Sequence, residues 1–319
     1  MQLTTEVVGR RVTVRYRDGD GARDVVGRVL AVSTLVSIER RDGTVVDVPV
    51  ASIILWRVVP DRPLRSRRAA AVTADDLGRV TAIGWPAPET VEIGDWQLRA
   101  ADGFTHRANS ALVVGDPGVT FTDAVRDVVA FYAERGLPPL VQVVVDSAPE
   151  AAFREQGWIP LDGPRGGALV QVADLERPVP ADPEVTVAPS LDDAWMSRYP
   201  RIEPGRVAAA RAVLAGPARV GFASFGKLAD GVAPIGIGRV VVTGEWAGLA
   251  ALEVHPDHRR IGLARRLVST MLSWATDRGA DKAYVQVTPD NAAALNLYEK
   301  LGFTTHHAYR YLVPQPPDT

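Results

Sequence analysis

The chain has 319 residues, of which 46% are hydrophobic and 23% charged, and its formal net charge is −2. A chain of this length predicts two or three domains, and this composition is typical of a soluble globular protein with no nucleic-acid or membrane partner. The absence of cysteine excludes disulfides, thiolate metal sites and a cysteine nucleophile. Without a signal-peptide pattern or a run of about 18 apolar residues, a cytoplasmic location is expected.

Residues 1–60 have the pattern of a small all-β module. Apolar residues alternate with polar ones over short segments, and Asp42-Gly43 is a dipeptide typical of a tight hairpin. The expected strands are 11–16, 25–32, 35–39, 44–50 and 53–59. About five strands in ~50 residues without a helical period predict a small closed barrel of the Src-homology-3 or Sm type. We expect it to serve packing or dimerisation, so a homodimer is one possible assembly.

Two proline-rich segments, residues 60–68 and 176–183, predict linkers that separate segment 69–178 from segment 183–313. Both segments contain a helix end, a strand, a helix and a glycine–aromatic pair in the same order. Gln142 to Gly157 spans 15 positions, and Gln286 to Gly302 spans 16. This self-similarity indicates duplication of one fold unit.

Segment 183–313 alternates strands and helices. A helix over 206–215 ends at Gly216-Pro217, and apolar residues at helical spacing predict another helix over 263–276. The expected strands are 185–187, 218–225, 234–242, 246–254, 284–287 and 304–313. The tail from Pro314 onward is expected to be disordered.

The most informative stretch runs from Leu252 to Leu267. An apolar strand breaks at Pro256, passes a basic turn and enters an amphipathic helix at about Gly262. Such a helix start presents unpaired backbone N–H groups and the positive end of the helix dipole, which together bind phosphate. Gly262 and Ala264 leave room for a diphosphate, and the neighbouring arginines add charge-assisted contacts.

Two motifs in segment 183–313 resemble those of the GNAT N-acetyltransferases. Residues 259–264, Arg-Arg-Ile-Gly-Leu-Ala, resemble the family's diphosphate loop, and its later signature is matched by Asn291, Ala294, Leu297-Tyr298 and Leu301-Gly302-Phe303. The resemblance covers residues 183–313 and implies an α/β (α+β) class, the GNAT fold with a central mixed sheet flanked by helices. With the internal repeat, it suggests a tandem arrangement similar to proteins of the mycothiol-synthase kind.

Segment 69–178 is accordingly interpreted as a degenerate GNAT-like half. Residues 114–119 stand where the diphosphate loop should be, contain no basic residue and include Asp116, which would repel a diphosphate. Phe153 falls near the position that corresponds to Tyr298 and has no proton to donate. We expect this half to act as a scaffold that shapes one wall of the substrate cleft.

The resemblance implies acetyl-CoA as co-substrate, with its pantetheine arm between two splayed strands at residues 252–254 and 286–287. The implied cofactor-binding residues are Leu252, Val254, Arg259, Arg260, Ile261, Gly262, Leu263, Ala264, Arg265, Asn291 and Tyr298. The backbone N–H near Val254 is a candidate donor to the thioester carbonyl. Asn291 would cap a helix or bind pantetheine, and the two roles are compatible.

Tyr298 is the expected general acid, because a phenol with a pKa near ~10 can protonate a departing thiolate. Glu253 is the candidate base, although strand alternation leaves open the face on which its side chain lies. Gly248 stands where some family members carry their glutamate. Other candidates are Glu245 in the nearby turn and His255 and His258, which we interpret as turn residues. Loss of the amine proton to bulk water is a further alternative.

The sequence therefore predicts an acetyl-CoA-dependent N-acetyltransferase that acetylates a primary amine of a small molecule or protein by direct attack. The alternative is an acyl-CoA-binding sensor or scaffold with vestigial catalysis. No motif identifies the acceptor, although Arg198, Tyr199 and Arg201 hint at acidic or aromatic acceptors. No metal site is expected, because His306 and His307, as neighbours on a strand, would point to opposite faces.

Overall fold

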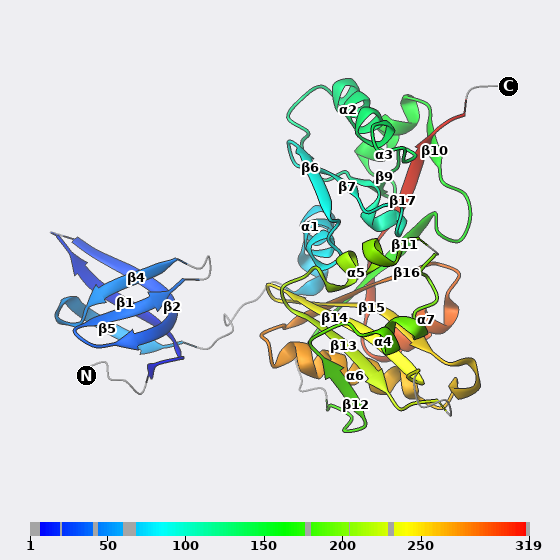
Figure 1. Ribbon diagram of the computed structural model, residues 1–319. Helices are drawn as coiled ribbons and strands as arrows, with labels where there is room; N and C mark the ends of the chain where they lie inside the picture. The colour runs from blue at the N-terminus through cyan, green and yellow to red at the C-terminus, as the bar shows by residue number, and fades with distance from the viewer. Residues whose placement is uncertain are drawn as a thin grey trace. The chain divides into compact units, whose positions relative to one another are not determined.

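The computed structural model describes residues 7–19, 21–40, 44–59, 68–175, 180–203, 205–228 and 233–316. The chain forms two compact units, Met1–Ser66 and Arg67–Thr319 (Figure 1). The predicted Asp42-Gly43 turn and most of the linker at 60–68 lie outside the described residues, as do residues 176–179 of the second linker. Among the described residues, no helix is long and apolar enough to cross a membrane.

The first unit is an antiparallel five-stranded sheet with strand order β4-β3-β2-β1-β5. Its strands are β1 (Arg11–Asp18), β2 (Gly21–Val32), β3 (Leu35–Glu39), β4 (Val45–Pro49) and β5 (Ile53–Val58). Alternate side chains of β1, β2 and β3 meet in one apolar core that includes Val12, Val14 and Ile38. The prediction of a separate all-β module is confirmed.

The second unit holds all the α-helices of the described residues. Its first part contains α1 (Ala74–Gly84), β6 (Glu89–Ile93), β7 (Trp96–Ala100), β8 (Ala111–Leu112), α2 (Phe121–Ala133), β9 (Val141–Val144), α3 (Ala148–Glu155), β10 (Trp158–Pro160) and β11 (Gly167–Asp174). Its second part contains β12 (Val185–Ala188), α4 (Asp193–Arg198), α5 (Val207–Ala215), β13 (Val220–Phe225), β14 (Gly236–Thr243), β15 (Trp246–Val254), α6 (Leu263–Thr276), β16 (Lys282–Val287), α7 (Ala292–Lys300) and β17 (Thr304–Pro314).

One 12-stranded sheet runs through this unit in the order β12-β13-β14-β15-β16-β11-β17-β9-β8-β7-β6, with β10 paired to β17. Each half contributes one parallel pair, β8 with β9 and β15 with β16. The halves also exchange strands: β11 lies between β16 and β17, while the end of β17 pairs with both β9 and β10. The segments 69–178 and 183–313 therefore fold as one compact body, and their limits remain sequence-based predictions.

The internal repeat is visible in the backbone. Gly136 after α2 and Gly279 after α6 both have left-handed φ angles, +61° and +93°. Gly157 after α3 and Gly302 after α7 do the same, at +78° and +85°. Left-handed glycines of this kind end helices, so the two halves turn from helix to strand in the same way at equivalent positions.

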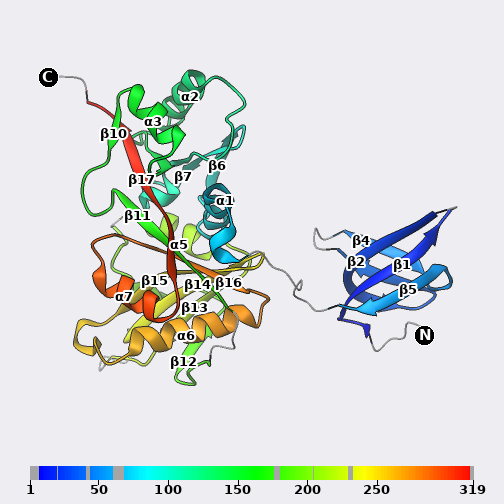
Figure 2. The same cartoon turned by 180° about the vertical axis from the view of Figure 1, so that it is seen from behind.

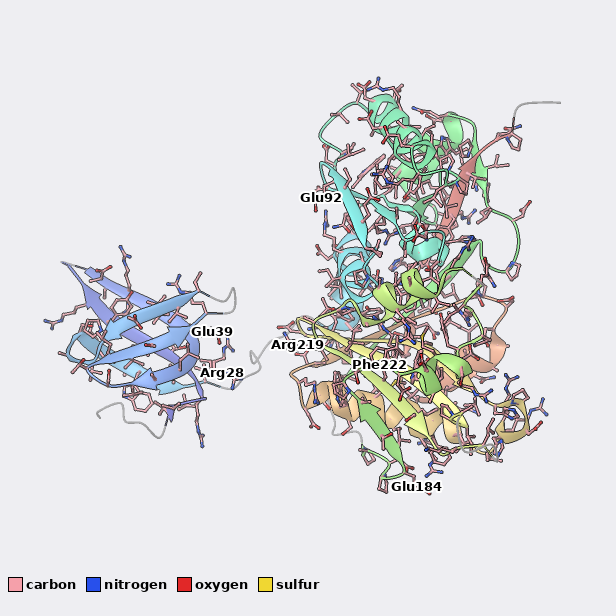
Figure 3. The ribbon with its side chains drawn as sticks, viewed as in Figure 1. Arg28, Glu39, Glu92, Glu184, Arg219 and Phe222 are labelled. Atoms are coloured by element: carbon pink, nitrogen blue, oxygen red, sulfur yellow. The ribbon has the colours of Figure 1, made fainter. Side chains whose placement is uncertain are left out.

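Helices cover both faces of the sheet in the second half (Figures 1 and 2). Leu267, Met271 and Ala275 of α6 pack with buried residues of β14, β15 and β16 on one face. On the opposite face, α4 and α5 pack on Phe222 of β13, which is labelled in Figure 3. The mixed sheet flanked by helices agrees with the predicted fold class.

The predicted disorder of the tail is wrong for its first residues. Pro314 pairs with Trp158 at the end of β17, and the Gln315 N–H donates to the Gly157 carbonyl over 2.9 Å. The prediction failed because the partner strand lies in the other half of the repeat, more than a hundred positions away in sequence. Residues 317–319 lie outside the described residues.

Candidate functional site

The site begins where two parallel strands separate. The pairing of β15 with β16 ends at Leu249 and Val285. Immediately beyond, β15 carries a bulge against β14, and Ala251 adopts a left-handed φ of +52°. A non-glycine residue in this conformation stores strain of about 1 kcal/mol or more, and such strain clusters at functional sites. The bulge turns the end of β15 away from β16 and leaves a wedge between them.

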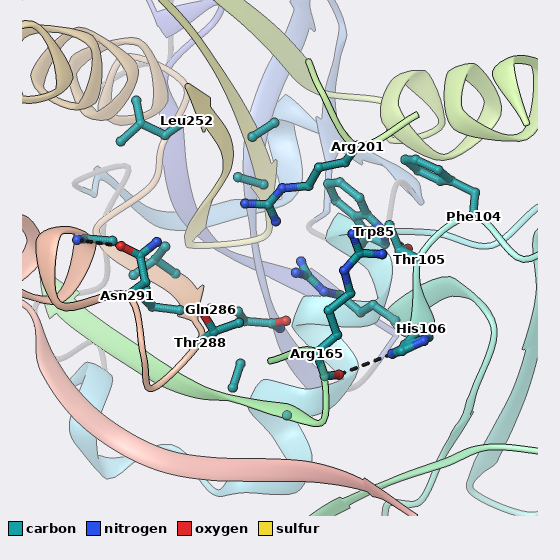
Figure 4. Close-up of a pocket in the computed structure, with 18 of the residues that line it drawn as sticks. Trp85, Phe104, Thr105, His106, Arg165, Arg201, Leu252, Gln286, Thr288 and Asn291 are labelled. Carbon is teal, nitrogen blue, oxygen red and sulfur yellow. Dashed lines mark hydrogen bonds between the residues drawn. The ribbon is translucent and has the colours of Figure 1, made fainter. Parts of the chain in front are cut away.

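The wedge opens into a cavity of about 290 Å³. Residues of β15 and β16 and the start of α7 line one side, where Figure 4 shows Leu252, Gln286, Thr288 and Asn291. The other side comes mainly from segment 69–178, from which Figure 4 shows Trp85, Phe104 and His106. The sequence did not predict these three residues as part of the site. Of the predicted cofactor residues, Leu252, Asn291 and Tyr298 line this cavity. The degenerate half thus forms one wall of the cleft.

The predicted phosphate turn follows β15 after a short 3-10 turn, Pro256–His258. Arg260 and Gly262 have left-handed φ angles of +63° and +87°, and Gly262 is the N-cap of α6 without a side-chain cap. Successive N–H groups in such a turn point to one side and form an anion-binding concavity at the positive end of the helix. Arg259, Arg260, Ile261 and Arg265 are exposed around it, while Leu263 is buried and anchors the helix. The geometry suits a diphosphate.

The equivalent turn of the first half is filled by its own carboxylates. Asp75 accepts from the Gly115 N–H over 3.0 Å, and Asp95 accepts from the Asp116 N–H over 3.0 Å. Asp116 in turn accepts from the Gly118 N–H over 2.7 Å. Three acidic side chains therefore occupy backbone donors that a phosphate would need, in agreement with the interpretation of this half as degenerate.

Tyr298 and Asn291 lie on α7 at the border of the cavity. The Asn291 Oδ1 caps the helix by accepting from the Ala294 N–H over 3.1 Å, which leaves its amide nitrogen available. The Tyr298 side chain is buried beside Phe303, and its hydroxyl makes no hydrogen bond within the described residues. Burial raises the pKa of Tyr298 well above its usual range. This phenol therefore stays protonated until a stronger base appears next to it.

Glu253 lies on β15 beyond the bulge, outside the lining of the cavity, as does Val254. Its carboxylate lies 3.5 Å from Arg201, which does line the cavity. His255 precedes the short 3-10 turn that His258 ends, and His255 Nδ1 accepts from the Asp257 N–H over 3.4 Å. The structure thus places the acid candidate in the lining of the cavity and the base candidate outside it, next to the lining residues Leu252 and Arg201.

The cavity also contains a cluster of arginines that the sequence did not single out, apart from Arg201. Arg107, Arg165, Arg201 and Arg206 line it, together with a single acidic residue, Glu203. Arg198, in contrast, lies elsewhere and donates to the Pro234 carbonyl. Of the missed arginines, Arg107 and Arg165 come from loops of the first half, and Arg206 directly precedes α5 in the second half. No periodic pattern or motif marks them as site residues.

The expectation that the side chains of His306 and His307 point to opposite faces is wrong. The pairing of β17 with β11 shifts register at this point, so the two neighbouring side chains lie together instead of on opposite faces. Their Nδ1 atoms are 2.7 Å apart, and His306 Nε2 lies 2.8 Å from the Val72 carbonyl oxygen. Among the described residues no group of three or more histidines and carboxylates could hold a metal ion.

Comparison with known proteins gives the same family as the motifs. Residues 73–312 match the family described as "Probable histone acetyltransferase Rv0428c C-terminal". The chain is 33% identical over 318 residues to "Probable histone acetyltransferase Rv0428c" of Mycobacterium tuberculosis, covering 97% of this chain and 96% of that protein. It is 26% identical over 250 residues to "Uncharacterized N-acetyltransferase YobR" of Bacillus subtilis, covering 73% of this chain and 96% of that protein.

Solved structures agree with the fold. A GCN5-related N-acetyltransferase from Kribbella flavida aligns with a TM-score of 0.56 at 17% identity, covering 80% of this chain and 98% of that chain. A tandem GNAT protein from the clavulanic acid biosynthesis pathway aligns with a TM-score of 0.54 at 19% identity, covering 79% of this chain and 91% of that chain. At these identities the likeness concerns the fold alone, including its tandem arrangement.

Proposed function

The chain belongs to the GNAT family of N-acetyltransferases, and from this premise we propose that it transfers an acetyl group from acetyl-CoA to a primary amine held in the cavity. The observation that carries the proposal is the wedge beyond Leu249 and Val285, on the strand that leads through a short 3-10 turn to the turn at Gly262. A strand edge that loses its partner offers backbone groups to an extended amide chain such as pantetheine. The turn offers N–H groups and arginines to the diphosphate of the same molecule.

Tyr298 and the backbone of β15 have separate roles in the proposed acetyl transfer. The amine nitrogen attacks the thioester carbonyl carbon, the C–S bond breaks, and the thiolate sulfur takes a proton from Tyr298. The new amide nitrogen then loses its extra proton, which restores the phenol directly or through water. Backbone N–H groups of β15 at the bulge are the candidate donors to the carbonyl oxygen as its charge develops. Burial keeps the phenol neutral before the reaction, so it holds the proton that the thiolate takes.

The amine must lose a proton before it attacks. Glu253 remains the candidate base, acting through water, since its carboxylate lies beside Arg201 but outside the lining of the cavity. Transfer of this proton to bulk water is the alternative. The two routes differ in their dependence on Glu253, so Glu253→Gln distinguishes them by whether the rate of thiol release falls.

The acceptor belongs to one of two classes, a small-molecule amine or a protein amine. The name of the Mycobacterium tuberculosis relative points to a histone as the acceptor of that protein. For this chain, the charge of the cavity is the better guide to the acceptor.

Two measurements test the proposal on the full-length chain. Isothermal titration with acetyl-CoA should show saturable binding, and free-thiol release should rise when amines are added. Absence of acetyl-CoA binding would refute the proposal. Binding that is never followed by thiol release with any amine would support the alternative of an acyl-CoA sensor with vestigial catalysis.

A further inference from the structure

The side of the cavity opposite the cofactor strands is strongly cationic. It carries four arginines and one glutamate, and this glutamate, Glu203, already lies 2.8 Å from Arg206. Arg201 likewise has Glu253 at 3.5 Å. Arg107 and Arg165 have no acidic partner within the described residues. An excess of unpaired guanidinium groups in a partly enclosed space is unfavourable unless an anion completes it.

Arg107 is the more informative of the two. Its Nε is shielded from solvent and has no hydrogen-bond partner in the described part of the chain, and its guanidinium lies 4.8 Å from the centre of the Trp85 ring. Since the guanidinium borders the cavity, a ligand there could supply the missing acceptor. Arginine binds carboxylates with two parallel N–H donors, which gives both affinity and orientation.

The loop that carries Arg107 is held in place by buried hydrogen bonds. Asn109 Oδ1 accepts from the N–H groups of Ala101 and Gly103, and its Nδ2 donates to the carbonyls of Phe104 and Thr105. Thr105 has a left-handed φ of +59°, a strained conformation for a β-branched residue. Trp85 Nε1 donates to Thr105 Oγ1 over 3.1 Å. Arg107 therefore lies on a loop that is strained and fixed by hydrogen bonds, as expected of a loop that binds a ligand.

We propose that the acceptor amine carries a carboxylate, and that Arg107, assisted by Arg165, binds it on the first-half side of the cavity. The inference rests on the proposed function and names the substrate class of the same site. Two points separate this anion site from the phosphate site. The turn at 259–265 does not line the cavity, and Arg107 comes from the other half of the repeat. A lysine-rich peptide, by contrast, would bring further positive charge to the four arginines.

The test compares matched amines with acetyl-CoA as donor, using thiol release to obtain kcat/KM. The pairs are L-alanine, L-phenylalanine and L-glutamine, each beside its own carboxamide, and a lysine-rich peptide forms a separate arm. We expect at least one amino acid to exceed its carboxamide by about tenfold or more, the scale of a charge-assisted bidentate contact. A second acyl donor, succinyl-CoA, shows whether Arg107 instead binds a carboxylate on the acyl group.

Variants assign any preference to its residues. Arg107→Gln should lower kcat/KM for the amino acid by about 10- to 100-fold, while the carboxamide changes little. Arg165→Gln, at an exposed position, should reduce the same preference without loss of folding. The matched control is Arg278→Gln, since Arg278 also lies over a tryptophan, 3.9 Å from the Trp274 ring, but outside the cavity.

The outcomes separate this inference from the proposed function. Loss of acetyl-CoA binding concerns the proposed function alone. If acetyl-CoA binds and no amino acid exceeds its carboxamide, or the lysine-rich peptide is the best acceptor, the carboxylate proposal is wrong while the acetyltransferase stands. The proposal is also wrong if Arg107→Gln selectively lowers the use of succinyl-CoA, because the arginine would then read the donor.

Discussion

The Nδ1 atoms of His306 and His307 lie 2.7 Å apart, within hydrogen-bonding distance. In the neutral pair, the Nε2 of His306 carries the proton that the Val72 carbonyl accepts, so its Nδ1 accepts from the Nδ1–H of His307. The tautomers of this neutral pair are thus fixed by a carbonyl from the first half. The pair connects β17 to the segment before α1.

This pair makes stability depend on pH. Burial lowers the pKa of His307 to about 4, with a further lowering by His306 and a small opposing effect of Asp75. As the pH falls below 6.5, the usual pKa of histidine, His307 binds a proton in the unfolded chain but not in the folded chain. Stability is thus fully present above that pH and is lost as the pH falls toward 4, by roughly 1 to 2 kcal/mol for this partly exposed group.

Urea unfolding at pH 7.0 and pH 4.5 measures the effect. In His307→Asn, which cannot titrate, the difference in unfolding free energy between the two pH values should be smaller than in the parent chain. His255→Asn, in a turn outside this pair, should leave the difference unchanged. Equal pH dependence in the parent chain and His307→Asn would contradict the assignment.

Removal of the Tyr298 hydroxyl should affect the reaction and not the fold. Tyr298→Phe should lower kcat by about 10²- to 10³-fold, within the range of general acid catalysis. Acetyl-CoA affinity from titration and the midpoint of thermal unfolding should stay close to those of the parent chain, since the hydroxyl has no hydrogen-bond partner in the described residues. Unchanged turnover would show that Tyr298 is not the acid.

The left-handed glycine of the phosphate turn allows a test with a closely matched control. Gly262→Ala and Gly279→Ala each place a methyl group in open space at a left-handed φ, +87° and +93°. Both should therefore destabilise the fold by about 1 to 2 kcal/mol. Only Gly262→Ala should also weaken acetyl-CoA binding, by about tenfold or more, because it alters the backbone that faces the diphosphate. Equal affinities in the two variants would argue against a phosphate site at this turn.

The sequence was sufficient to predict those elements that depend on neighbouring residues alone. The strand, turn and helix at 246–276 follow from apolar period, proline and glycine, and the structure has β15 and α6 in those places. The strand exchange between β11 and β17 was not predictable from periodicity, because hydrophobic pattern gives no information about which distant strand is the partner. Arg107 was missed for a similar reason: its loop is defined by Asn109 and packed Trp85, which only the folded chain brings together.

Arg239 gives the last prediction, and it concerns how the two halves are held together. This fully buried side chain on β14 donates from Nη1 to the Gly84 carbonyl at the end of α1 over 3.0 Å, and from Nε to the Leu214 carbonyl near the end of α5 over 2.7 Å. Burial lowers the pKa of Arg239 to about 10, so it remains charged at neutral pH. A cation suits this position because helix C-termini carry partial negative charge.

Arg239→Met keeps much of the buried volume but removes every donor to those carbonyls. We expect a loss of about 2 to 4 kcal/mol in the free energy of unfolding, measured by urea denaturation, because the helix ends stay buried without partners. Arg126→Met, which removes an exposed arginine paired with Asp123, is the control and should change stability little. If Arg239→Met unfolded at the same urea concentration as the control, the two helix ends would be satisfied by other groups, and α1 would not depend on β14 for its position.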